Sequence, residues 1–206
     1  MPSSPSRPHV LPVRAQAASE PVPPAGFLAA VASLDRADLH SEAIARQTPA
    51  PSRIAPWAAA RSIELGEPAT GRLVYLHDPA GQPAWSGNDR LVAFTRVEID
   101  QDMAADPLLS DVVWDWLSEA LAGHGAHAIA LGGTVTTTVS RRYGSLAHVG
   151  ASHEVELRCS WTPTVADPEP DAGPDLGAHL AALVATMAAM RGLPPEVPGV
   201  TALGNR

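Results

Sequence analysis

The sequence predicts an α+β fold, a two-layer sandwich in which helices pack on one face of a mostly antiparallel sheet of about five strands. Several segments alternate apolar and polar residues with period two and follow one another through short polar connections, which favours antiparallel pairing. Three other segments have a helical period with one apolar face, which must pack against a sheet. The expected order is α-β-β-β-α-β-β-α.

The first half of the domain is predicted to hold one helix and three strands. In residues 26–37, Phe27, Val31 and Leu34 share one helical stripe. Residues 55–66 and 69–78 are expected to be strands, and residues 90–100 show the clearest strand pattern. The second face of this last strand is partly apolar, because it carries Val92 and Phe94.

The second half is predicted to hold a helix, two strands and a last helix. Asp106 can cap a helix with Pro107 at its first position, and Gly123 can end it. Strands follow at residues 128–139 and 152–161, and a helix at residues 175–191. The first of these strands contains adjacent glycines, Gly132 and Gly133, which predict a bulge. The second places five residues on one apolar face: His153, Val155, Leu157, Cys159 and Trp161.

Composition sets the expected domain limits. Residues 1–24 are rich in proline, serine and alanine and are predicted to be a disordered tail. Residues 25–192 form a single α+β domain with an acidic, proline-rich linker at 162–174, and residues 193–206 form a C-terminal tail.

Charge and cysteine content exclude several kinds of function. The chain has 22 acidic and 14 basic residues, a formal net charge of −8, and all its basic residues are arginines. This balance disfavours nucleic-acid binding, and the lack of lysine removes lysine-based catalysis. The single cysteine, Cys159, excludes an internal disulfide and a cysteine zinc site. No apolar run is long enough to span a membrane, so a cytoplasmic protein is expected.

The stretch "HDPAGQ" resembles a catalytic loop, but its residues also fit a type I turn at positions 78–81. Aspartate accepts a backbone bond at the first position, proline fixes the second, and glycine suits the last. The turn is the favoured interpretation. A binding role for this corner stays open, and the side chains that would serve it are His77, Trp85, Arg72 and Arg90.

Two histidines, His124 and His127, lie three residues apart after the central helix. A zinc site needs three or four ligands, and no carboxylate stands at a recognisable spacing from this pair. No metal or other cofactor is therefore expected, and these histidines are the only metal candidates. Cys159 belongs to an apolar strand face, which predicts a core residue and not a nucleophile.

Trp114 lies off the apolar stripe of the central helix, where a tryptophan can anchor a partner. Together with the partly apolar strand face of Val92 and Phe94, it indicates a protein-binding surface.

Six segments, taken in order, resemble an uncharacterised family of actinobacterial proteins, a "domain of unknown function" family. They are "PAPSRIAPWAAA", "TGRLVYLHDPAGQPAW", "MAADPLLSDVVWDWL", "GGTVT", "VELRCSWTP" and "MRGLPP", and the resemblance covers roughly residues 26–197. It implies a bacterial cytoplasmic protein with a house-keeping role. No catalytic residues are assigned to such a family, so the resemblance implies none here.

Three functions are compatible with these observations. The favoured one is a non-enzymatic binding or adaptor protein that uses a protein surface, with a protein partner or a homodimer. The alternative is a small-molecule or metal-dependent enzyme that uses His124 and His127. The third is an RNA-associated accessory protein, which the acidic charge disfavours.

Overall fold

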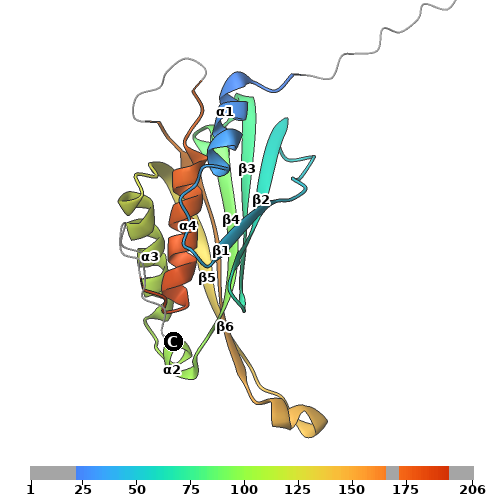
Figure 1. The fold of residues 1–206 in the computed structure, drawn as a ribbon, viewed down its shortest axis with the longest axis vertical. Coiled ribbons are helices and arrows are strands. Elements are labelled where there is room, and N and C mark those ends of the chain that lie inside the picture. Colours follow the sequence, from blue (N-terminus) through green and yellow to red (C-terminus); the bar gives the residue numbers. More distant parts are fainter. Residues whose placement is uncertain (1–21, 166–171, 195–206) are drawn as a thin grey trace, which may run out of the picture.

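The computed structural model describes residues 22–165 and 172–194. Six strands form one sheet in the order β1-β2-β3-β4-β6-β5, with every neighbouring pair antiparallel. The helices α1, α4 and α3 lie on one face of this sheet (Figure 1). The predicted α+β two-layer architecture is therefore confirmed. Most of the tails predicted at residues 1–24 and 193–206, and residues 166–171 of the linker predicted at 162–174, lie outside the described residues.

The first four strands form a meander after α1 (Ala25–Leu34). They are β1 (Ala43–Gln47), β2 (Trp57–Leu65), β3 (Ala69–Gln82) and β4 (Gly87–Ile99). The short edge strand β1 is an addition to the predicted set. Its residues are half-buried or exposed and show no apolar row, so the sequence pattern could not distinguish it from a loop.

The turn predicted at positions 78–81 is displaced. Strand β3 continues to Gln82 with an irregular register after His77, and the chain reverses in the short helix η1 (Pro83–Trp85). The Asp78 carboxylate accepts the Ala80 N–H at 3.0 Å, as a turn aspartate does, but within this irregular part of the strand. Pro83 then begins the reversal, because its fixed φ suits a helical turn.

The second half runs α2 (Gln101–Ala104), α3 (Leu109–Gly123), β5 (Ala128–Ser140), η2 (Gly144–Val149), β6 (Ser152–Pro163) and α4 (Leu176–Met190). Helix α3 begins later than the predicted cap, because Asp106 accepts the N–H of Leu108 at 2.8 Å and so closes a preceding turn. Helix α4 lies where it was predicted, and Asp175 caps it by accepting the Gly177 N–H at 3.0 Å.

The main core lies between the helices and the face of the sheet that they cover. The apolar row predicted on β6 is buried there, with Val155, Leu157 and Trp161 fully enclosed. Helix α4 is the most buried helix and packs against α3, α1 and the sheet. Burial of so much apolar surface is the main stabilising contribution to the fold.

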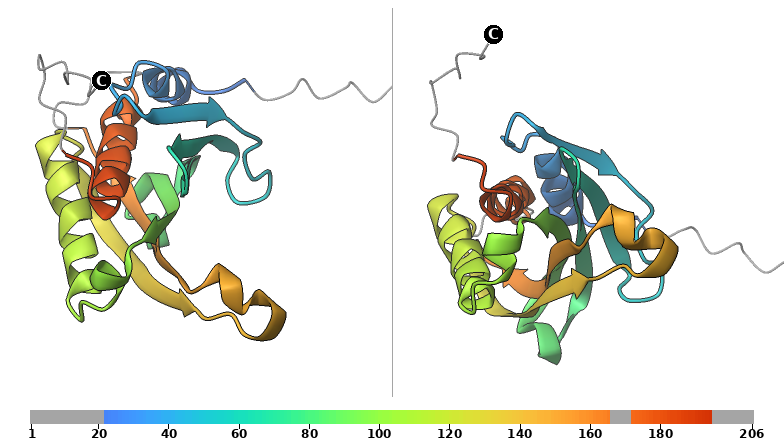
Figure 2. Two further views of the ribbon diagram at one scale, coloured as in Figure 1. Left: turned by 60° about the horizontal axis from the view of Figure 1, so that its bottom comes forward. Right: turned by 90° about the horizontal axis from the view of Figure 1, so that it is seen from below.

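Two features of the sheet matter for function. The face on which the described part of the chain places no helix is called the open face, and the opposite one the covered face. Strands β5 and β6, closed by η2, form a hairpin called here the arm. The end of the arm, residues 141–151, is called the arm tip and projects beyond the helices and the other strands (Figures 1 and 2). Within the described residues, no helix is long and apolar enough to cross a membrane.

Candidate interaction surface

A row of side chains crosses the centre of the open face. The register of β3, β4 and β6 places Arg72 opposite Phe94, and Phe94 opposite Arg158. These positions alternate with the buried residues of the same strands, so all three side chains are on the open face. An aromatic ring is thus flanked by arginines from both neighbouring strands.

Two guanidinium groups pack over the Phe94 ring. The Cζ atom of Arg158 lies 5.1 Å from the ring centroid, and that of Arg96 lies 5.9 Å from it. Both distances are in the range of cation–π contacts. The two arginines therefore give the centre of the open face a positively charged edge around an apolar ring.

Glu156 holds both arginines in place. Its carboxylate accepts hydrogen bonds from Arg96, one of them from Nε at 3.0 Å, and from Nη2 of Arg158 at 3.0 Å. These bonds, first those from Arg96 and then those from Arg158, lower the pKa of Glu156. The hydrogen bonds with Glu156 in turn raise the pKa of Arg96. The two guanidinium groups are therefore held in fixed positions over the ring by a carboxylate of the same chain.

A shallow hollow of about 350 Å³ adjoins this row. It lies where Gly132 and Gly133 leave the surface without side chains beside Val92. The bulge predicted at these glycines is displaced, because both pair regularly with β6 and the register shifts just before them, between Ile129 and Gly132. Val92 is 40% exposed, which is unusual for a valine in the middle of a central strand. The open face therefore offers an apolar recess next to its arginine and aromatic centre.

The side chains predicted for the corner of the sheet separate onto different surfaces. Arg72 joins the open-face row and also donates to the Pro49 carbonyl. Arg90 donates to Ser160 Oγ at 2.7 Å and to the Ala130 carbonyl at 3.1 Å, so it links β4 to β6 and to the bulge of β5. Trp85 is only 8% exposed and lies outside the main core cluster. It therefore has little surface for a partner.

His77 lies on the covered face, in a cluster with Tyr75 and Asp89. The Asp89 carboxylate accepts the Tyr75 hydroxyl at 2.6 Å and lies 2.8 Å from His77 Nδ1. Phe27 of α1 stacks on Tyr75 with ring centroids 5.4 Å apart. Burial, with Asp89 nearby, raises the pKa of the Tyr75 hydroxyl, which therefore stays a hydrogen-bond donor. These contacts attach α1 to the end of the sheet.

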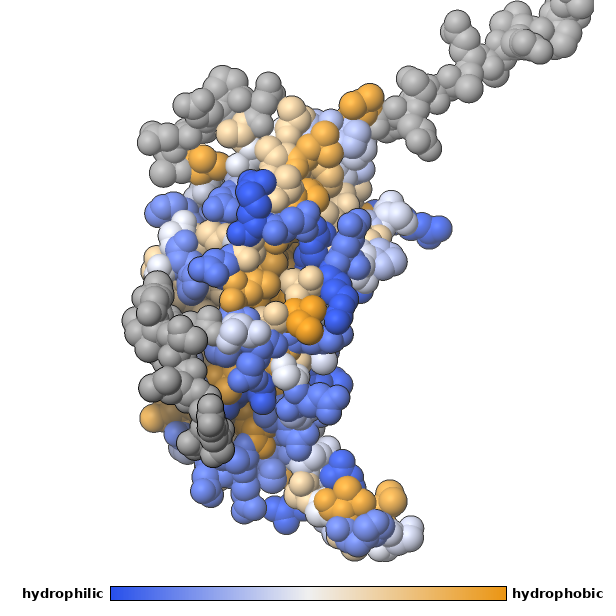
Figure 3. Space-filling view, in the orientation of Figure 1, coloured by the Kyte–Doolittle hydropathy of each residue, from blue (hydrophilic) through white to orange (hydrophobic). Residues whose placement is uncertain are grey.

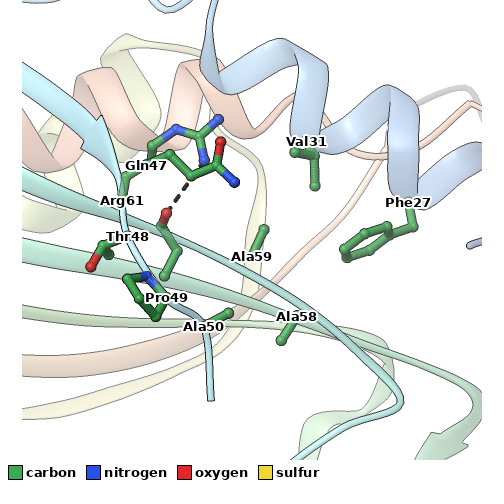
Figure 4. Close-up of a pocket in the computed structure, with 10 residues that line it drawn as sticks. Phe27, Val31, Gln47, Thr48, Pro49, Ala50, Ala58, Ala59 and Arg61 are labelled. Atoms are coloured by element: carbon green, nitrogen blue, oxygen red, sulfur yellow. Dashed lines mark hydrogen bonds between the residues drawn. The ribbon is translucent and has the colours of Figure 1, made fainter. Parts of the chain in front are cut away.

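A larger hollow, of about 500 Å³, lies between α1 and the edge of the sheet (Figure 4). Phe27 and Val31 face it from the helix, and Ala58 and Ala59 of β2 line it from the sheet. Its polar lining includes Arg61, whose buried guanidinium pairs with Asp35 at 2.7 Å. The arginine is thus occupied by an ion pair, and the remaining surface is mostly small apolar side chains.

Trp114 lies on α3, away from the open face. It is partly buried and packs against the main core cluster, at the edge of the buried stripe of Leu109, Val113 and Leu117. Its role as a partner anchor stays a prediction.

The metal candidates His124 and His127 follow α3. Both are exposed, and His124 Nδ1 lies 2.8 Å from the Ala120 carbonyl at the helix end. Across residues 22–165 and 172–194, no group of three or more His, Cys, Asp or Glu side chains is arranged to hold a metal ion. Cys159 is buried in the core, and burial raises the pKa of its thiol to about 12, as expected for a core residue.

Sequence reasoning identified Val92, Phe94 and Arg72 but missed Arg96 and Arg158 as neighbours of the ring. Period-two alternation already places Arg158 on the second face of its strand. It does not reveal that β6 pairs with β4, because helices α2 and α3 and strand β5 separate these two strands in the chain. The missing signal is strand order, which a single sequence does not contain.

The fold and this surface define a class of protein: an α+β protein whose sheet is packed by helices on one face and exposes an arginine and aromatic centre on the other. A family model described as "Protein of unknown function (DUF3000)" matches residues 23–201. The chain therefore belongs to the DUF3000 family, which confirms the resemblance to a domain-of-unknown-function family over most of the chain. No curated protein and no solved structure matches the chain significantly.

Proposed function

We propose that this chain is a non-enzymatic binding or adaptor protein whose open face receives a protein partner. The observation that supports this proposal is the row of Arg72, Phe94 and Arg158 on a sheet face that no helix of the described residues covers. Arginine and aromatic side chains are enriched among the residues that contribute most to protein–protein affinity, usually near the centre of an interface. The hollow beside Val92 would take an apolar side chain of the partner.

The charge pattern of the open face favours a protein over a nucleic acid. Glu98, Glu154 and Glu156 lie on the same face as the arginines, and Glu156 is bonded to two of them. A phosphate backbone would meet these carboxylates, and the whole chain carries a formal charge of −8. A protein surface that carries both signs of charge is more complementary than a phosphate backbone to this mixture of arginines and glutamates. The proposal retains the actinobacterial, cytoplasmic setting that the sequence resemblance implies.

The test is affinity purification of the tagged full-length chain from its own bacterial host, with quantitative mass spectrometry of the proteins that copurify. Phe94→Ala removes the ring, and Arg158→Glu reverses an exposed charge beside it. Loss of a central aromatic or arginine contact costs about 2 kcal/mol, or roughly thirtyfold in affinity. Each variant is therefore expected to lose the specific partner that the unmodified chain retains.

Ile44→Ala is the matched control, because Ile44 is an apolar side chain, 48% exposed, on the open face of the edge strand β1, and strands β2 and β3 separate it from Phe94. It should retain the partner. Thermal unfolding of all variants would show that the fold is intact. If Phe94→Ala and Arg158→Glu retained the same proteins as the unmodified chain, the open face would not be the binding surface.

A further inference from the structure

Strand β5 forms one edge of the sheet, and in the described part of the chain no segment pairs with its outer side. It is thirteen residues long and contains no charged residue and no proline. Natural edge strands are usually short or carry lysine, proline or inward-pointing charges, which prevent pairing with another chain. A long uncharged edge with free backbone N–H and C=O groups is instead a template for a further strand.

The part of β5 after its bulge is the most accessible. From Gly132 to Ser140 every residue is exposed except the half-buried Val135, and Val139 is 48% exposed. The arm to which this stretch belongs extends away from the helices (Figure 2). An incoming strand would therefore find both the edge and its flanking side chains unobstructed.

The composition of this stretch suits pairing with itself. In an antiparallel pair about a two-fold axis near Thr136, the open-face residues Thr134, Thr136 and Thr138 of one copy face the same three threonines of the other. Threonine pairs across strands are favourable, and no like charges oppose each other. The opposite edge strand, β1, contrasts with it, because it is only five residues long and carries Arg46.

The ends of such a pair are complementary in charge. The same axis would place the arm tip of one copy beside the first residues of β5 in the other copy, next to which α3 packs. The sequence contains no aspartate or glutamate from residue 120 to residue 153, so the tip carries only the positive charges of Arg141 and Arg142. Helix α3 carries an exposed acidic row at four-residue spacing: Asp111, Asp115 and Glu119.

The arm tip also exposes several large apolar side chains to solvent. Tyr143, Leu146 and Val149 are 78%, 56% and 55% exposed, and apolar residues gather at this end of the molecule in Figure 3. Ile129, at the start of β5, is 45% exposed. Pairing of two arms would bring both groups together and remove apolar surface from water.

From these observations we infer that β5 is the contact through which two copies of this chain associate, as an antiparallel β5–β5 pair that joins two sheets into one of twelve strands. A two-fold pair closes on itself, so association stops at the dimer. The inference does not depend on the function proposed for the open face. It adds that two open faces would lie side by side on one continuous sheet.

The test is the mass of the full-length chain in solution, measured by light scattering over a concentration series. The unmodified protein should show twice its chain mass of 21.4 kDa. Thr136→Lys places like charges opposite each other at the centre of the pair and should raise the dimer dissociation constant at least tenfold. Within one chain the new side chain would lie beside Glu156, so the monomer should still fold.

Thr70→Lys is the matched control, since it introduces the same exposed side chain on the open face beside Glu64, far from the β5 edge. This variant should stay dimeric. A single-chain mass for the unmodified protein at every concentration, or a dimer that Thr136→Lys leaves unchanged, would overturn the inference.

Cross-linking gives a second measurement that does not depend on charge. Thr136→Cys should form a disulfide between two copies on mild oxidation, because the two thiols would lie across the axis from each other. The native Cys159 is buried and does not compete. Thr70→Cys should form none at the same concentration, and equal cross-linking of the two variants would contradict a β5 contact.

Discussion

His179 of α4 accepts the indole N–H of Trp161 at 3.1 Å and is 2% exposed. Burial lowers its pKa from the ordinary 6.5 to about 4; His127 adds a smaller lowering effect, and the Asp175 carboxylate opposes both. The unfolded chain therefore takes up a proton at this histidine below pH 6.5, and the folded chain does so only near pH 4. The neutral, buried His179 therefore contributes fully to the free energy of unfolding above pH 6.5. This contribution is lost progressively as the pH falls toward 4.

The expected size of this loss is about 2 kcal/mol between pH 7 and pH 5, from the linkage of the two pKa values. Urea unfolding at both pH values measures it. In His179→Gln the new side chain does not titrate, and its amide oxygen can still accept the Trp161 N–H. Between pH 7 and pH 5 the free energy of unfolding of this variant should therefore fall by about 2 kcal/mol less than that of the unmodified protein. Equal falls in the two proteins would show that His179 does not control the acid sensitivity.

At the scale of the elements, the contact between β5 and β6 depends on one glycine. A Cβ atom at Gly133 would lie 2.4 Å from the Arg158 carbonyl oxygen and 2.7 Å from Cys159 Cβ, which backbone movement alone can relieve. Gly133→Ala should therefore lower the free energy of unfolding by about 2 kcal/mol, as overpacking of a close contact does. Chemical denaturation measures the change.

Gly132→Ala serves as the control for that substitution. No atom lies within 4 Å of a Cβ atom at Gly132, although it is the adjacent residue of the same strand. Its stability should change by less than about 0.5 kcal/mol. If the two substitutions changed the stability by similar amounts, the loss at Gly133 would arise from general strand propensity and not from the close approach of β6.

The elements also show how far the sequence determines the fold. Alternation identified β4 and β6 correctly. The bulge predicted at Gly132 and Gly133 lies just before them instead, at Ala130 and Leu131, where Ala130 has a positive φ and the register with β6 shifts. Asp78 made the bond expected of a turn residue, yet the strand continued past it, because local hydrogen bonding alone does not determine where a hairpin ends. Strand order, and with it the grouping of Phe94 with Arg158, arises from long-range pairing that local patterns do not contain.

At the scale of the whole molecule, the helices within residues 22–165 and 172–194 occupy one face of the sheet and leave the other face and the β5 edge uncovered. The open face carries both signs of charge. Acidic residues outnumber basic ones over the chain, whereas the open-face centre and the arm tip are rich in arginine. The two proposed contacts therefore use the parts of the sheet that the described helices leave exposed.

A dimer formed through β5 also makes thermal stability depend on concentration, because dissociation accompanies unfolding. For a chain of this size, a hundredfold increase in concentration should raise Tm by about 4 °C, given typical unfolding enthalpies per residue. Calorimetry of the unmodified chain and of Thr136→Lys over that range measures the effect. The variant, which unfolds from a monomer, should keep a constant Tm, while Thr70→Lys should follow the unmodified chain. A constant Tm in all three proteins would show that folding and association are not coupled, and the continuous twelve-stranded sheet would then have to be abandoned.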